Sequence, residues 1–210
     1  MGNDYYILEK GEQTGPFTFD ELTDMGLDVH SRVLSPLADG WQDACDLQEF
    51  YAYFEAQGIY LPTGDNLATF GWRLLAYIID YVIYSILMQY TLVILASMGI
   101  TFNLRSMDDL FKMPIFQMLE LQVIYSLIII VYNSICEASA MKGSIGKRIF
   151  KLVVVDIDGQ GLSYLNALLR SVGKTLSIFF IYTGFISIFF SEHRQAFHDY
   201  LAKTYVVKRD

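Results

Sequence analysis

The chain has 210 residues, of which 53% are hydrophobic and 18% charged, and its formal net charge is −8. This composition excludes disordered and collagen-like chains. Residues 1–70 hold 13 acidic and 2 basic residues, a net charge of −11, whereas residues 71–210 hold 10 acidic and 13 basic residues, a net charge of +3. This shift indicates two regions in different surroundings. The acidic region argues against a nucleic-acid partner, because it has too few cations to neutralise phosphates.

The first region, 1–60, predicts a small α+β domain. A β-prone segment, 5–8, comes first and is followed by glycine and proline turn signals. Thr18 and Glu21 have the spacing of a capping box, which predicts the start of a short helix. A second helix is predicted from residue 46, because apolar side chains recur there at helical spacing.

Aromatic and turn residues follow one another in a particular order in this region. The order is Tyr5-Tyr6, Gly15-Pro16-Phe17, Glu21-Leu22 and Gly40-Trp41. It resembles the bacterial GYF-like domain, and related GYF domains bind proline-rich peptides on an aromatic patch. The resemblance implies Tyr6, Phe17 and Trp41 as peptide-binding candidates, because stiff polyproline helices dock between aromatic faces. The alternative is that these three rings fill a small core.

Two long apolar runs follow a linker, 61–71. The first, ~73–98, and the second, ~115–136, are each long enough to cross a bilayer, which takes roughly 20 apolar residues. A third hydrophobic segment, ~172–190, is short for a span, so we favour re-entry over a third crossing. The sequence therefore predicts an α-helical polytopic membrane domain, 72–208, with two full spans, this third segment, and the α+β domain at its N-terminus.

Lysine and arginine are spread unevenly over the loops. The loop after the first run, 99–114, has two, whereas the loop after the second, 137–174, has six. The positive-inside rule places the richer loop in the cytoplasm, and with it the N-terminal domain. The chain starts with polar and acidic residues, so we expect no signal peptide.

Polar and charged residues lie within or beside the apolar runs. Arg73 and Asp80 are seven residues apart and share a helix face, and Asn133 and Glu137 are four apart on the second run. Arg170 and Lys174 flank the third segment. A carboxylate in the hydrocarbon costs roughly 2.5–3.5 kcal/mol on insertion scales, so it needs a partner. We expect these groups to meet in one intramembrane charge cluster, either as a functional site or as ion pairs that fix helix packing.

Several separated motifs occur in order over residues 70–208. They are Trp72-Arg73-Leu74-Leu75-Ala76, Ile79-Asp80, Gly143-Ser144-Ile145-Gly146-Lys147-Arg148, Ala167-Leu168-Leu169-Arg170 and His198-Asp199. Their order resembles the RDD family, which is named for one Arg and two Asp. The resemblance places the second Asp at Asp199, which we therefore count in the intramembrane charge cluster. Lys203 departs from the pattern, since members often have Gly there. The resemblance implies a polytopic protein of the bacterial cytoplasmic (inner) membrane, in a family for which transport has been proposed.

Other motifs give no catalytic, metal or cofactor site. The glycines at 143–147 lack the spacing of a phosphate loop and predict a turn before a strand instead. Residues 156–159 form a turn signal rather than a calcium loop. His193 and His198 lack the spacing of metal ligands. No set of nucleophile, base and orienting group emerges, so we expect neither enzymatic activity nor a cofactor.

Two functions of different class follow from these observations. In the first, the protein is a membrane adaptor or assembly factor: the head binds a protein ligand such as a proline-rich peptide, and the membrane part docks other membrane proteins or a second copy. In the alternative, it is a small transporter or ion antiporter in which Arg73 and Asp80 alternate between paired and ligand-bound states. Three short segments do not readily enclose a pathway, and no inverted repeat is visible, so the adaptor is favoured.

Overall fold

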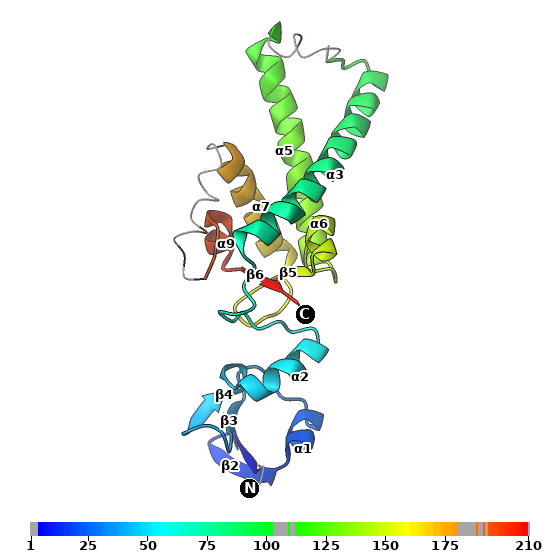
Figure 1. Cartoon of the computed structure of the whole chain (residues 1–210). Helices are drawn as coiled ribbons and strands as arrows, with labels where there is room; N and C mark the ends of the chain where they lie inside the picture. Colours follow the sequence, from blue (N-terminus) through cyan, green and yellow to red (C-terminus); the bar gives the residue numbers. More distant parts are fainter. Residues whose placement is uncertain are drawn as a thin grey trace. The chain divides into compact units, whose positions relative to one another are not determined.

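The chain divides into two compact units in the computed structural model (Figure 1). The described residues are 4–102, 109, 112–179, 188, 191 and 193–209. The first unit, here called the head, comprises Met1–Pro62 and Ile157–Gln160. The second, here called the helical unit, comprises Thr63–Asp156 and Gly161–Asp210.

The head is a small α+β domain, as predicted, built on an antiparallel sheet of order β2-β1-β3-β4 (Figure 1). Its strands are β1 (Tyr5–Glu9), β2 (Glu12–Phe17), β3 (Arg32–Leu34) and β4 (Trp41–Asp43). Its helices are α1 (Phe19–Asp24), the short 3-10 helices η1 (Ala44–Asp46) and η2 (Gln48–Phe50), and α2 (Tyr51–Ala56).

The two predicted helices of the head begin in different ways. The capping box of Thr18 and Glu21 is present at α1, with each side chain bonded to the backbone of the other residue. The second helix does not run from residue 46 as predicted. Leu47 is extended and buried, so the chain makes two 3-10 turns first and becomes α-helical only at Tyr51. Burial of the Leu47 side chain accounts for the late start.

The core of the head is apolar throughout. Its buried members are Tyr5, Ile7, Leu22, Leu27, Val29, Val33, Ala44, Leu47, Phe50, Phe54 and Leu61. Among the described residues of the head, no charged side chain is buried. Ordinary burial of apolar area therefore stabilises this unit.

The helical unit contains two long helices, α3 (Phe70–Ser97) and α5 (Ile115–Ala138). Both are long and apolar enough to cross a membrane, and only 11% and 6% of their most apolar windows are buried. A core helix of a soluble protein buries most of its apolar surface, whereas these helices expose it, as lipid-facing helices do. They are the two candidate spans, and they cover the two runs predicted from sequence.

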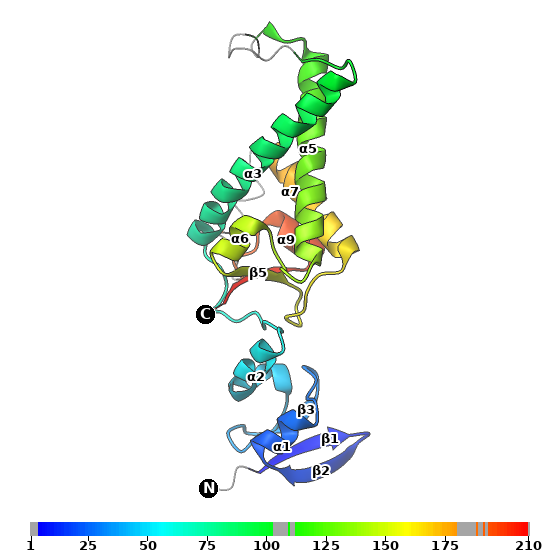
Figure 2. The same ribbon diagram turned by 90° about the vertical axis from the view of Figure 1, so that its right-hand side faces the viewer.

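Shorter elements gather around the Phe70 end of α3 and the Ala138 end of α5 (Figures 1 and 2). They are α6 (Ile145–Ile149), β5 (Leu152–Val155), α7 (Tyr164–Phe179), α9 (Phe197–Ala202) and β6 (Tyr205–Lys208). β5 and β6 pair antiparallel, with Val153 opposite Val207, so the loop after α5 is tied to the C-terminal segment. Much of the predicted third hydrophobic segment, ~172–190, lies outside the described residues.

Candidate functional site

Buried charged side chains from five helices meet in the helical unit, in what we call the charge cluster. Its members are Arg73 and Asp80 on α3, Glu137 on α5, Lys147 on α6, Arg170 and Lys174 on α7, and Asp199 on α9. Asp80, Glu137 and Asp199 are each at most 1% exposed. The polar residues predicted to meet therefore lie together, and Asn133 of α5 lies among them.

Arg170 stands at the centre of the cluster. Its guanidinium donates to Glu137 Oε1 at 2.5 Å and to Asp199 Oδ1 through Nε at 3.0 Å. Asp199 Oδ2 in turn accepts from Arg73 Nη1 at 2.5 Å, and Glu137 Oε1 accepts from Lys147 Nζ at 2.6 Å. These contacts form a chain of alternating charge that joins α3, α5, α6, α7 and α9. Removal of a residue from this chain deprives an oppositely charged buried group of a partner.

Asp80 is held by neutral donors. Its carboxylate accepts hydrogen bonds from Ser144 Oγ at 2.5 Å, Gly146 N at 2.9 Å and the Tyr132 hydroxyl at 3.1 Å. Among the described residues it forms no ion pair. The hypothesis from the sequence that Arg73 and Asp80 pair with each other is therefore wrong, because Arg73 forms its ion pair with Asp199 instead.

Gly146 allows the close approach of α6 to α3 that this arrangement requires. A Cβ at this position would lie 2.1 Å from the carbonyl oxygen of Ala76, which no side chain tolerates. The glycine thus brings its own N–H within reach of Asp80. The sequence motif at 143–148, which was taken as a turn before a strand, is a short helix capped by Ser144.

Burial and neighbouring charges shift the pKa values of the titratable groups on α6 and α9, which lie outside the two candidate spans. Burial by itself would raise the pKa of Asp199, but the Arg170 and Arg73 guanidiniums outweigh it and hold that pKa well below its usual range. Burial and the neighbouring Arg170 lower the pKa of Lys147 to about 8. Burial also lowers the pKa of His198 to about 3, so this imidazole is neutral near pH 7.

A cavity of about 270 Å³ opens beside the cluster. Its charged lining consists of Arg73, Asp80, Lys147, Arg170 and Lys174. The remaining walls are mostly apolar and aromatic: Phe70, Leu74, Ala76, Tyr77, Ile188 and Val206, with His198 beside them. The cavity thus joins apolar surface to buried charge of mainly positive sign.

The head presents a second candidate site, on the outer face of its sheet. Paired residues of neighbouring antiparallel strands point to the same face, and Tyr6 pairs with Leu34, which pairs with Trp41. All three are half-buried, whereas Ile7 and Val33 point into the core. We call Tyr6, Leu34 and Trp41 the aromatic face. Two of the three predicted patch residues lie on it.

Phe17 lies elsewhere. It pairs with Tyr5, which is a core residue, and its ring packs against the core cluster of the head. It is half-buried, so it belongs to the edge of the core rather than to the aromatic face. Tyr6 and Trp41 therefore lie where a binding patch would be, whereas Phe17 lies at the edge of the core.

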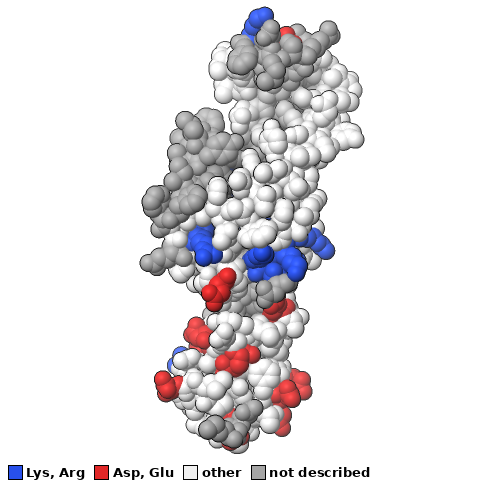
Figure 3. Space-filling model, in the orientation of Figure 1, with Lys and Arg blue, Asp and Glu red and all other residues white. Residues whose placement is uncertain are grey.

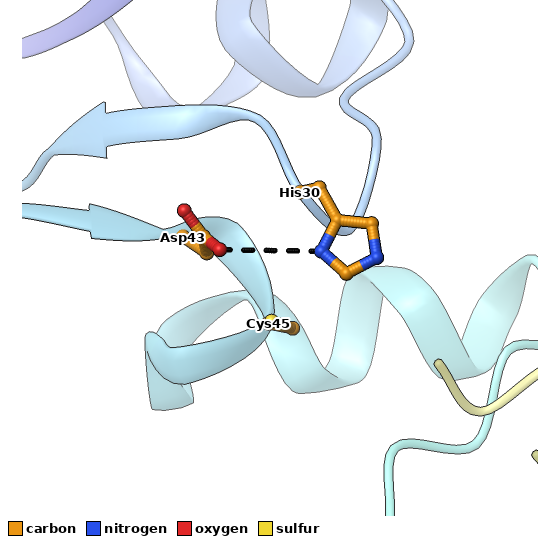
Figure 4. Close-up of side chains that lie close together, drawn as sticks. All are labelled: His30, Asp43 and Cys45. Atoms are coloured by element: carbon orange, nitrogen blue, oxygen red, sulfur yellow. Dashed lines mark ion pairs between the residues drawn. The ribbon is translucent and has the colours of Figure 1, made fainter. Parts of the chain in front are cut away.

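The head also brings together His30, Asp43 and Cys45, whose donor atoms lie within 4.8 Å of one another (Figure 4). These are residue types that bind zinc. His30 Nδ1 lies 4.0 Å from Asp43, and its Nε2 lies 3.0 Å from Asp158 in the 157–160 turn. Arg32 lies 3.4 Å from the same Asp43 carboxylate. Asp43 therefore already has a cationic partner in Arg32.

Sequence reasoning missed Lys147, Ser144 and Tyr132 as members of the site. Ser144 and Lys147 stand in the motif 143–148, whose order was noted without a role for each residue. Tyr132 lies next to Asn133 in an apolar run, where nothing in the spacing marks it as a partner of Asp80. The contacts of Tyr132 and Ser144 with Asp80 span 52 and 64 positions and depend on helix packing, which local patterns do not specify. Lys147 meets Glu137 over only 10 positions.

Comparisons with known proteins cover both regions. A model of the RDD family matches residues 67–203, and a model of GYF domain 2 matches residues 5–50. The chain is 33% identical over 146 residues to the uncharacterized protein YxaI of Bacillus subtilis (strain 168), an alignment that spans 67% of this chain and 96% of that protein. No solved structure matches the chain. The two resemblances seen in the sequence are confirmed.

Proposed function

Because the chain belongs to the RDD family and carries a GYF-type head, we propose that it is a membrane-anchored adaptor that binds its partner by the aromatic face. In this proposal the head lies in the cytoplasm and binds a proline-rich segment of another protein. α3 and α5 hold it in the bacterial inner membrane, where the helical unit docks membrane partners. The function is binding, without catalysis.

The position of the aromatic face, half-buried on the outer side of the sheet, is the observation that carries the proposal. The core of the head is complete without Tyr6 and Trp41, so packing does not explain two large rings on the outer side of the sheet. Leu8, which is 39% exposed, follows Tyr6 on the same side by strand alternation. A row of rings separated by an aliphatic side chain is a surface on which a polyproline helix docks.

The charge of the head favours a ligand that carries lysine or arginine beside its prolines. Residues 1–70 have a net charge of −11, and acidic side chains dominate the visible face of the head (Figure 3). Basic side chains appear instead on the helical unit, near β5 and β6. Attraction of opposite charges raises the association rate, and salt weakens it.

The geometry of the charge cluster supports a scaffold rather than a transport pathway. Asp80 is closed by three donors, and Asp199 by two guanidiniums and the backbone N–H of Ala196. A carboxylate that exchanges ions during transport needs an oxygen free to change partners. The neutral amides and hydroxyls around Asp80 give it a fixed set instead, which favours the adaptor over the antiporter.

A fluorescence titration tests the binding role. In the full chain reconstituted in nanodiscs, Trp72→Phe leaves Trp41 as the one tryptophan. A synthetic proline-rich peptide with flanking lysines should change its emission with a saturable dependence. Tyr6→Ala should weaken this binding about tenfold or more, the size of effect seen at aromatic hot spots. Tyr164→Ala, an exposed tyrosine on α7, is the matched control and should bind as the parent does.

Two results would contradict the binding role. One is a titration without saturation for the parent protein. The other is equal affinity for the parent and Tyr6→Ala with the head still folded by circular dichroism.

Cysteine labelling tests the orientation. With Cys45 and Cys136 replaced by serine, single cysteines are placed at Leu37, which is 80% exposed in the head, and at Lys112, between α3 and α5. An impermeant maleimide applied to intact spheroplasts should label position 112 and leave position 37 unlabelled. Labelling of position 37 alone would place the head outside.

A further inference from the structure

The cavity of the helical unit has an excess of positive charge. Four cations line it, Arg73, Lys147, Arg170 and Lys174, against a single carboxylate, Asp80. Three of these cations pair with Glu137 or Asp199 just outside the lining, so the charge cluster holds four cations against three carboxylates, an excess of one positive charge. The net positive charge around this cavity therefore favours the binding of an anion.

Lys174 is the cation with the poorest set of partners. Its side chain is 6% exposed, and its Nζ donates to the Asn133 amide oxygen at 3.2 Å and lies 5.8 Å from the centre of the Tyr77 ring. Among the described residues, Lys174 forms no ion pair, whereas Arg73, Lys147 and Arg170 each contact a carboxylate. A buried ammonium whose direct contacts are all neutral is costly even with carboxylates nearby, and a bound anion would reduce that cost.

The apolar walls of the cavity distinguish between kinds of anion. Leu74 is 44% exposed and lies on the outward surface of α3, while Phe70 and Ile188 also line the cavity. A free inorganic anion gains nothing from such walls, because it prefers water to hydrocarbon. An anion attached to acyl chains gains from both parts of the cavity.

The position of Trp72 marks the depth of the cavity in the membrane. Trp72 is 37% exposed, next to Arg73, and the Lys208 ammonium lies 3.7 Å from the centre of its ring. Tryptophan and lysine together are typical of the membrane–water interface, where phosphate headgroups lie. The start of α3, which lines the cavity, is thus at headgroup level.

We propose that this cavity binds the headgroup of an anionic phospholipid, with Lys174 as its main phosphate contact and Leu74 beside the first acyl carbons. The lipid would complete the neutralisation of the charge cluster and fix α7 against α3. Basic pockets between membrane helices bind anionic headgroups in this way. The proposal does not depend on what the head binds.

Thermal unfolding of the full chain in detergent micelles tests the proposal with phosphatidylglycerol, phosphatidylcholine and inorganic phosphate as probes. Phosphatidylglycerol should raise the unfolding temperature and remain bound in native mass spectrometry, whereas the other two probes should do neither. Lys174→Gln should weaken phosphatidylglycerol binding at least about fivefold, the ratio for loss of one lysine contact. Lys151→Gln, at an exposed lysine, is the matched control and should leave binding unchanged.

Leu74→Gln gives a second test that keeps all charges. Because Leu74 is partly exposed, the variant should fold and should bind phosphatidylglycerol more weakly than the parent does. Equal stabilisation by phosphatidylcholine would overturn the proposal, as would unchanged binding by Lys174→Gln. Stabilisation by inorganic phosphate that matches phosphatidylglycerol would overturn the lipid as occupant and leave a free-anion site.

Discussion

The two units of this protein place charge in opposite ways. Among its described residues, the head buries mostly apolar and aromatic side chains and no charged ones. The helical unit exposes apolar side chains along α3 and α5 and buries ion pairs between its helices. In water, apolar burial drives packing, whereas lipid gives helices no such force, so polar contacts and close backbone approach must specify their arrangement. This difference indicates which substitutions should reduce the stability of each unit most.

The largest effect is expected at the centre of the buried charges. Arg170→Gln leaves Glu137 and Asp199 without their shared cation, and loss of one partner of a buried pair costs about 3–5 kcal/mol. Thermal unfolding in micelles should show a clear loss of stability. Lys151→Gln, at an exposed cation, should change little; equal effects of the two variants would show that the charge cluster contributes no more than a surface charge.

A somewhat smaller effect is expected where backbones meet. Gly146→Ala puts a Cβ against the Ala76 carbonyl oxygen and Asp80, so α6 must move away from α3. Overpacking of this kind costs about 1–3 kcal/mol. Gly40→Ala, in the head, is the matched control, because a Cβ there would contact nothing within 4 Å. A stable Gly146→Ala protein would refute the close packing of α6 on α3.

Acid should weaken the helical unit through His198. Its folded pKa of about 3 lies below the ordinary 6.5, so only the unfolded chain takes up the proton as pH falls from 6.5 to 3. Stability should therefore fall over that window, by at most about 1.4 kcal/mol per pH unit. Asp199, Arg170, Lys174 and Lys147 face this imidazole and set its charge environment.

The measurement for His198 is the difference in unfolding temperature between about pH 7 and about pH 5. His198→Asn should reduce this difference, whereas His193→Asn, at an exposed histidine, should preserve it. An unchanged acid response in His198→Asn would assign the effect to other groups. Asp199 acts only at lower pH, because its folded pKa lies below its ordinary value of 3.8.

The smallest effect is expected at Lys203. It ends α9 in the left-handed conformation with φ of 51°, which costs a side chain about 1 kcal/mol. Lys203→Gly should relieve this strain and raise stability by up to about 1 kcal/mol, less the greater freedom of the unfolded glycine. Lys203→Ala removes the charge but keeps the strain, so it should not gain. A gain for alanine equal to that for glycine would point to charge instead.

Much of the local structure could be predicted from the sequence. The Thr18 and Glu21 spacing predicted the start of α1, and the apolar runs predicted α3 and α5. These features depend on residues close in sequence or on composition. The departure at Lys203 falls at the residue that ends α9 in the left-handed conformation.

The partners within the charge cluster were less predictable. Arg73 and Asp80 share a helix face, yet Arg73 pairs with Asp199, which is 126 positions away, and Asp80 is capped by α6. Spacing in the sequence indicates which polar groups lie at the same depth in the membrane, but it does not indicate which helix packs against them. In the head, strand pairing put Tyr6 and Trp41 on one face and Phe17 at the core edge, a division that no local pattern contains.

The central claim is that recognition resides in the aromatic face of the head and that the buried charges serve as scaffold. The most direct test measures binding of the lysine-flanked proline-rich peptide to the full chain in nanodiscs by calorimetry, for the parent, Trp41→Ala and Asp80→Asn. The account predicts that Trp41→Ala abolishes binding, while Asp80→Asn lowers stability but, in its folded fraction, binds with the parent's affinity. Loss of binding in Asp80→Asn together with retention in Trp41→Ala would contradict it.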